Sequence, residues 1–223
     1  MALPAGASGV RTVAVLVVVL VVVGAVLFWR WPRSSSPPAA AQVVVIGDSV
    51  TYASSPAILE QFEGQAEVTI TSRPFYRTAD LVAPLAEVLD ARRDAGDPLD
   101  RLIVLAGYND VIRDDRDPSG LPRLMDLAEQ FDCTVWLTLP ERPGGGPAGD
   151  DGFPPDEATA WNDRVRAQAA GRPRVHVSDR WQRTVEADEG AELLQEDGVH
   201  PVRAGHLALA DAMSRALAEE CTG

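Results

Sequence analysis

A serine that follows a buried strand is the residue of this chain best placed to act as a nucleophile. Gly47-Asp48-Ser49 comes directly after four β-branched residues, Val43–Ile46. Such an all-apolar run predicts a strand of a parallel sheet that is buried on both faces. Open α/β sheets bind their ligands at the carboxyl ends of their strands. The hydroxyl of Ser49 is therefore expected at the edge of the sheet where a ligand would bind.

A serine nucleophile needs a base, and the chain offers three histidines for this role. His200 lies in Asp197-Gly198-Val199-His200-Pro201, with a carboxylate three residues before the imidazole. This spacing lets Asp197 fold back on His200, fix its tautomer and stabilise the imidazolium. The alternative is an ordinary Asp-Gly turn that leads into a helix. His176 alternates within an expected strand and His206 lies in the last expected helix, so structural roles suit these two better.

A second polar motif, Gly107-Tyr108-Asn109-Asp110, follows the buried run Leu102–Ala106. It is expected at the same edge of the sheet as Ser49, because both motifs end a strand. The side-chain amide of Asn109 can donate a hydrogen bond to the oxyanion that forms when an acyl carbonyl is attacked. The alternative is that Asn109 and Asp110 make a turn or cap the next segment.

Strands and helices alternate along residues 42–223, which predicts one domain with helices on both faces of a parallel sheet. The strand patterns cover residues 43–46, 67–71, 102–106, 134–139 and 174–177. The helical patterns cover residues 56–62, 78–93, 121–131, 155–170 and 201–220. The last helix opens with a proline, which the first turn of a helix tolerates. The glycine- and proline-rich segment 141–155 follows the fourth strand and is expected to border the substrate site.

The first 41 residues differ in composition from the rest of the chain. Residues 12–29 contain no charged side chain and, at about 1.5 Å per residue, can just cross a hydrocarbon core of roughly 30 Å. We expect residues 1–11 to be an N-terminal flank, residues 12–29 a single transmembrane anchor and residues 30–41 a linker rich in Ser, Pro and Ala. A cleaved signal peptide is the alternative, although its apolar region is usually about 7–15 residues long. The basic residues on the two sides nearly balance, so they do not fix the orientation.

The expected domain is strongly acidic. Beyond Arg33 the chain has 17 arginines, no lysine and 33 acidic residues, which leaves a net charge of −16. This charge argues against nucleic acid as a partner, because nucleic-acid binding needs a basic surface.

The two cysteines, Cys133 and Cys221, are expected just before a strand and just after the last helix. Both places lie at the end of the sheet opposite Ser49, so a disulfide is geometrically possible, and it would be typical of an exported domain. Two buried free thiols are the alternative.

Taken together, the motifs of residues 42–220 resemble those of the SGNH (GDSL) hydrolase superfamily. Gly-Asp-Ser near the domain start, Gly-x-Asn-Asp after the third strand and Asp-x-x-His before the last helix carry the resemblance. It implies a three-layer α/β/α flavodoxin-like sandwich with five parallel strands. It also implies hydrolysis of ester or acyl bonds without a metal or another cofactor.

Carried over by position, the resemblance implies a catalytic triad. Ser49 would be the nucleophile, His200 the general base and acid, and Asp197 its orienting partner. Asn109 and the backbone N–H of Ser49 would donate to the oxyanion. Asp48 would shape the turn before the nucleophile.

The chain departs from this family at the third oxyanion donor, where a glycine normally follows the second strand. Phe75 aligns best with that glycine, in the segment Ser72–Thr78. Its backbone N–H can still donate, although a Cβ restricts the conformations that aim it. Arg77 is the nearby side chain that could compensate. The residues expected to contact the substrate are Asp48, Gly107, Tyr108 and Arg77.

The sequence therefore predicts a membrane-anchored serine esterase or deacylase with its domain outside the cytoplasmic membrane. The expected substrates are acyl esters, acetyl esters included, on cell-envelope glycans or lipids, a choice that follows from the location alone. One alternative is an acyltransferase that uses the same triad. The other is a binding module that keeps the fold and has lost efficient catalysis.

Overall fold

The computed structural model describes residues 41–113, 119–141, 153–187 and 190–222. The expected flank, anchor and nearly all of the linker lie outside these residues, as does most of the segment 141–155. Within the described ranges, no helix combines the length and the apolar composition that a membrane span requires.

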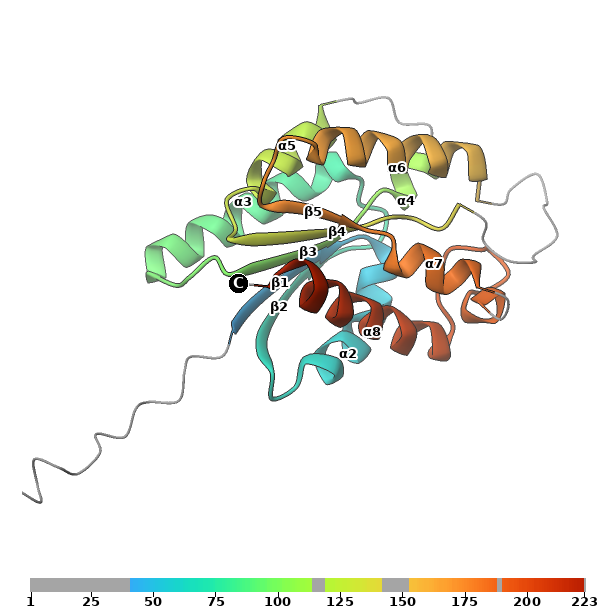
Figure 1. Ribbon diagram of the computed structural model, residues 1–223, viewed down its shortest axis with the longest axis horizontal. Coiled ribbons are helices and arrows are strands. Elements are labelled where there is room, and N and C mark those ends of the chain that lie inside the picture. The colour runs from blue at the N-terminus through green and yellow to red at the C-terminus, as the bar shows by residue number, and fades with distance from the viewer. Residues whose placement is uncertain (1–40, 114–118, 142–152, 188–189, 223) are drawn as a thin grey trace, which may run out of the picture. The chain divides into compact units, whose positions relative to one another are not determined.

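Five parallel strands form one sheet in the order β2-β1-β3-β4-β5 (Figure 1). The chain order reverses between β1 and β3, and in open α/β sheets ligands bind outside the carboxyl ends of the strands at such a switch point. This architecture confirms the predicted flavodoxin-like fold. The strands are β1 (Ala41–Gly47), β2 (Ala66–Ser72), β3 (Arg101–Leu105), β4 (Cys133–Leu137) and β5 (Val175–Ser178).

Helices cover both faces of the sheet, which makes the three layers (Figure 1). One face carries α3 (Thr78–Ala95), α5 (Gly120–Ala128) and α6 (Pro155–Ala169). The other carries α2 (Ser49–Phe62), α7 (Arg180–Glu186) and α8 (Arg203–Glu220). The short helix α4 (Tyr108–Ile112) follows β3, and a 3-10 turn, η1 (Gly190–Leu193), follows α7.

The central strands are almost wholly buried, because helices cover them on both sides. Val43–Ile46 of β1 and Leu102–Leu105 of β3 have at most 1% of their surface exposed. The predicted apolar stripe of α8 is buried as well, and it consists of Leu209, Met213, Ala216 and Leu217. The sheet edge that carries the chemical motifs therefore stands on a rigid core.

Two helices begin two or more residues away from their predicted starts. Helix α2 begins at Ser49 and not at Pro56, because the carboxylate of Asp48 accepts a hydrogen bond from the N–H of Val50 at 3.1 Å and caps the helix there. Pro56 lies inside this helix on its exposed side. Helix α8 begins at Arg203 and not at Pro201, because Pro201 pairs with Leu194 in an isolated antiparallel bridge.

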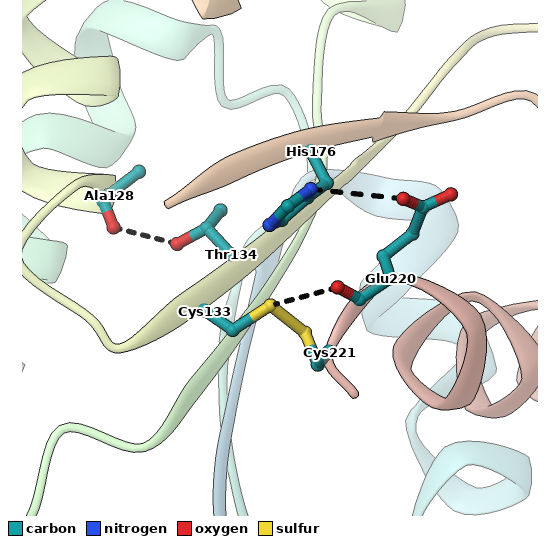
Figure 2. Close-up of a disulfide and its surroundings, with 6 residues drawn as sticks. All are labelled: Ala128, Cys133, Thr134, His176, Glu220 and Cys221. Atoms are coloured by element: carbon teal, nitrogen blue, oxygen red, sulfur yellow. Dashed lines mark hydrogen bonds and ion pairs between the residues drawn. A yellow bond between two sulfur atoms is a disulfide. The ribbon is translucent and has the colours of Figure 1, made fainter. Parts of the chain in front are cut away.

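A disulfide joins Cys133, at the start of β4, to Cys221, just after α8 (Figure 2). The two Cα atoms are 5.8 Å apart, although 88 residues separate them in sequence. The structure therefore selects the bridge over the two free thiols.

Beside the disulfide, Nδ1 of His176 lies 3.8 Å from a carboxylate oxygen of Glu220. His176 thus lies next to a carboxylate at the end of the sheet opposite Ser49.

Candidate active site

The turn that carries Ser49 depends on the glycine before it. Gly47 ends β1 between Ser72 of β2 and Leu105 of β3. A Cβ on Gly47 would lie 2.1 Å from Oγ1 of Thr51 and 2.4 Å from the carbonyl oxygen of Leu105. Only glycine fits so close to the neighbouring backbone, and this lets the strand pass directly into α2. Ser49 is the first residue of that helix, at the carboxyl edge of the sheet.

Three side chains from the two ends of the domain form one hydrogen-bonded chain. Nε2 of His200 lies 3.0 Å from Oγ of Ser49, 151 residues away in sequence. Nδ1 of His200 lies 2.7 Å from Oδ2 of Asp197. Both distances are hydrogen bonds by ordinary criteria. The structure thus brings together the nucleophile, base and orienting carboxylate that the sequence motifs predict.

The carboxylate of Asp197 is held by the backbone as well as by the imidazole. Its Oδ1 accepts hydrogen bonds from the N–H groups of Val199 and His200, both at 2.9 Å. Partial burial alone would raise the pKa of Asp197, but these hydrogen bonds and the one from the imidazole outweigh it and lower the pKa below the usual value. Asp197 therefore stays ionised when His200 is neutral, as an orienting carboxylate requires.

The Asn109 turn is fixed by a second glycine. Gly107 has φ 127°, and a Cβ on it would lie 2.2 Å from Nε1 of Trp161. Nδ2 of Asn109 donates to the backbone carbonyl of Tyr76 at 3.0 Å. A side-chain amide has two N–H donors, so this bond orients the amide of Asn109 and leaves one donor for an oxyanion.

The sequence of this chain matches the GDSL-like lipase/acylhydrolase family over residues 45–208. The chain belongs to this family. The matched segment includes Ser49, Asn109, Asp197 and His200, and the family assignment made from the motifs is confirmed.

Solved structures of three GDSL-type or related enzymes share the fold. The lipase/acylhydrolase from Enterococcus faecalis has a TM-score of 0.61 and 16% identity over 79% of this chain and 95% of its own. The C-terminal catalytic domain of peptidoglycan O-acetyltransferase A from Streptococcus pneumoniae has a TM-score of 0.60 and 16% identity over 82% of this chain and 96% of its own. Esterase EstA from Pseudoalteromonas has a TM-score of 0.59 and 12% identity over 80% of this chain and 97% of its own. No curated protein matches the sequence significantly.

In this GDSL-family chain, the Asp of the Gly-Asp-Ser motif is completely buried. Burial raises the pKa of Asp48 to about 7; the N–H of Val50 opposes this shift, and the charge of Asp110 adds to it. Its side chain is therefore enclosed by the protein, and a contact of Asp48 with the substrate stays a prediction. It shapes the turn before the nucleophile, which is the other role that the motif implies.

Tyr108 is also buried, and its side chain points into the core. Its hydroxyl accepts a hydrogen bond from Nε1 of Trp181 at 2.9 Å, and its ring centroid lies 5.4 Å from that of Phe153. Burial raises the pKa of this phenol above its usual value. The side chain of Tyr108 therefore belongs to the core, and Gly107 likewise leaves room for the indole of Trp161. A contact of either residue with the substrate stays a prediction.

The loop between β2 and α3 lies against the Asn109 turn. The carboxylate of Asp110 accepts hydrogen bonds from Thr78, at 3.0 Å from its N–H and 2.7 Å from its hydroxyl. Asp110 thus holds the first turn of α3, a helix that precedes it in the chain, and not the start of the segment that follows it. Thr78 and the carbonyl of Tyr76 were not among the predicted site residues, because backbone partners leave no signal in a sequence.

Phe75, aligned with the family glycine, has a φ of 68°. Within the part of the chain that the structure describes, it is the one residue other than glycine with a positive φ. The loop therefore keeps the left-handed conformation that glycine adopts freely, despite the Cβ. Arg77 lies just before α3, where its N–H donates to Asp80 at 3.0 Å.

No cluster of three or more His, Cys, Asp or Glu side chains with metal-binding geometry occurs among the described residues. The described side chains that meet at this edge of the sheet are a serine hydroxyl, an imidazole, a carboxylate and an amide.

Proposed function

We propose that this GDSL-family protein is a serine esterase or deacylase that cleaves acyl esters through Ser49, His200 and Asp197. The observation that carries the proposal is the continuous chain of short contacts from the hydroxyl through the imidazole to an ionised carboxylate. A buried structural serine would not need a base that is itself oriented by a third group.

The direction of the hydrogen bonds follows from the carboxylate. An ionised Asp197 only accepts hydrogen bonds, so Nδ1 of His200 carries the ring proton and Nε2 is the free acceptor. Nε2 then removes the proton from the hydroxyl of Ser49 while Oγ attacks the acyl carbonyl. The protonated imidazole gives its proton to the leaving alcohol. Water, activated by the same nitrogen, releases the acid and restores Ser49.

The oxyanion formed in each step needs donors that are already in place. Asn109 supplies an amide that the carbonyl of Tyr76 holds in position. The N–H groups of Ser49 and Phe75 are the further donors in this proposal, and the guanidinium of Arg77 supplies a positive charge to the same oxyanion. Removing one such donor in a serine hydrolase typically costs about 2.7–4 kcal/mol of transition-state stabilisation.

The proposed setting is the outer side of the cytoplasmic membrane, with residues 12–29 as the anchor and cell-envelope glycan or lipid esters as substrates. The disulfide between Cys133 and Cys221 supports this setting, because such bonds persist in oxidising compartments.

The test is covalent labelling of the full-length protein, purified in a mild detergent, with a fluorophosphonate probe. We expect Ser49 to be the labelled residue, and Ser49→Ala to lose both the labelling and the hydrolysis of 4-nitrophenyl acetate. The matched control is Ser55→Ala, which changes a serine of the same helix that bonds only to the carbonyl of Thr51. Labelling or turnover that survives in Ser49→Ala would overturn the proposal. A wild-type protein that neither reacts nor turns over would instead favour a binding module.

A further inference from the structure

Phe75 has two energetically unfavourable features at a single position. Its backbone is in the left-handed region, which strains a bulky residue. Its side chain is 68% exposed, which makes it the most exposed large apolar residue of the described part of the chain. Neither feature stabilises the fold.

The local turn explains the backbone of Phe75 but not its side chain. The N–H of Tyr76 donates to the carbonyl of Arg73 at 3.4 Å, so residues 73–76 form a hydrogen-bonded turn with Pro74 and Phe75 at its centre. Proline followed by a residue with positive φ is the pattern of a type II turn, which favours glycine or asparagine at the second position. A glycine would satisfy this turn better than phenylalanine. The phenyl ring therefore needs a reason outside the turn.

The turn that carries the ring lies beside Asn109, one of the proposed oxyanion donors. Asn109 contacts the next residue, Tyr76, and the guanidinium of Arg113, at the end of α4, lies 5.2 Å from the centroid of the Phe75 ring. This cation–π contact holds one face of the ring. Two further exposed apolar side chains, Ile112 and Tyr52, lie one helical turn after Asn109 and Ser49 respectively.

We propose that the Phe75 ring, steadied by Arg113, binds the apolar chain of a substrate whose acyl group is longer than acetyl. The proposal rests on the proposed ester hydrolysis at Ser49 and names its substrate class. The N–H of Phe75 is a proposed donor to the carbonyl oxygen of the bound ester. The ring belongs to the same residue and is therefore expected close to that carbonyl group. An acetyl group ends before it can reach the ring, whereas a chain of about six carbons covers it and removes apolar surface from water.

The experiment compares 4-nitrophenyl hexanoate with 4-nitrophenyl acetate, using the ratio of their kcat/KM values. For the full-length wild type we expect a ratio well above one. Phe75→Ala and Phe75→Gly are each expected to lower the ratio about tenfold, because both remove the ring. Arg113→Gln is expected to lower it about threefold. The control is Leu59→Ala, which changes an apolar residue that is 49% exposed and lies ten positions after Ser49 on α2, or about 15 Å along the helix. It should leave the ratio within twofold.

The two Phe75 variants also separate the ring from the backbone. Glycine removes the strain at φ 68° and alanine keeps it, so a difference between them in acetate turnover reports the N–H donor and not the ring. An unchanged ratio in both variants, with turnover of both esters still dependent on Ser49, would overturn the inference and leave the proposed function standing. Absence of Ser49-dependent turnover of either ester in the wild type would overturn the proposed function itself.

Discussion

The hydroxyl of Ser54 lies 2.8 Å from Nδ1 of His206, so a second serine–histidine contact joins the same two segments as Ser49 and His200. Ser54 is completely buried, five residues after Ser49 on α2, and His206 lies in the first part of α8. Burial lowers the pKa of His206, and the nearby imidazole of His200 lowers it further, so both effects favour the neutral form of His206. This inner contact fixes the helix that carries Ser49 against the helix that follows His200.

The first prediction concerns this inner contact. Ser54→Ala should lower the free energy of unfolding by about 1 kcal/mol, the usual net value of a hydrogen bond, and should lower kcat for an acyl ester more than it raises KM. Urea unfolding and steady-state kinetics measure the two effects.

Replacement of His206 gives the matched pair of variants. Asparagine places an amide atom near the position of Nδ1, whereas glutamine places it near Nε2. His206→Asn should therefore retain more kcat than His206→Gln. Equal losses in the two variants would mean that the contact with Ser54 does not position the triad.

Much of the fold was predictable because buried parallel strands leave a strong local signal. The apolar runs of β1 and β3 predict central strands, and both are central in the sheet. The place of the motif residues at one edge of the sheet was predictable for the same reason, since parallel strands bring their carboxyl ends to one edge. Helices α4 and α7 were missed, because five and seven residues are too few to show a helical period.

The missed parts of the site depend on contacts between distant segments. Ser54 reads as an ordinary helix residue, and only the packing of α8 against α2 gives it a histidine partner. The burial of Asp48 and Tyr108 could not be read from their motifs, because polar residues at a strand end can face either the substrate or the core. The positive φ of Phe75 follows from its place after Pro74 in a hydrogen-bonded turn. A sequence normally signals such a φ by a glycine, and this chain has phenylalanine there.

The second prediction concerns Gly107. A Cβ there would lie 2.2 Å from Nε1 of Trp161, and the alanine would have to adopt a φ of 127°. Gly107→Ala should therefore destabilise the domain by about 2–4 kcal/mol. It should also displace Asn109 and lower kcat. The control is Gly171→Ala, where φ is 89° but nothing lies within 4 Å of the new Cβ. If the two variants lose the same stability, the contact with Trp161 contributes nothing and the backbone angle alone matters.

The third prediction concerns the disulfide, which closes a loop of about 90 residues. The chain-entropy estimate for such a loop is about 4.6 kcal/mol, and native disulfides typically contribute about 2–5 kcal/mol. Replacing Cys133 and Cys221 together with alanine should therefore lower the urea midpoint substantially. Adding a reductant should lower the midpoint of the wild type and leave that of the double variant unchanged. A wild-type midpoint that does not respond to complete reduction would contradict this.

The last prediction is a pH dependence of stability that originates at Asp48. Its pKa is about 7 in the folded protein and about 3.9 in an unfolded chain. Between these values the folded carboxyl keeps its proton and the unfolded one loses it, so this group makes the protein less stable as the pH rises from about 4 to 7. Above pH 7 both states are ionised and the effect is constant.

Asp48→Asn isolates this contribution, because asparagine keeps an oxygen to accept the N–H of Val50 but cannot ionise. Urea unfolding of both proteins at several pH values gives the difference, wild type minus variant, in the free energy of unfolding. We expect that difference to fall steadily from pH 4 to 7 and then to level off. A difference that stays flat or rises over this range would show that the buried carboxyl ionises as easily in the folded protein as in the unfolded chain, so that burial does not hold its proton.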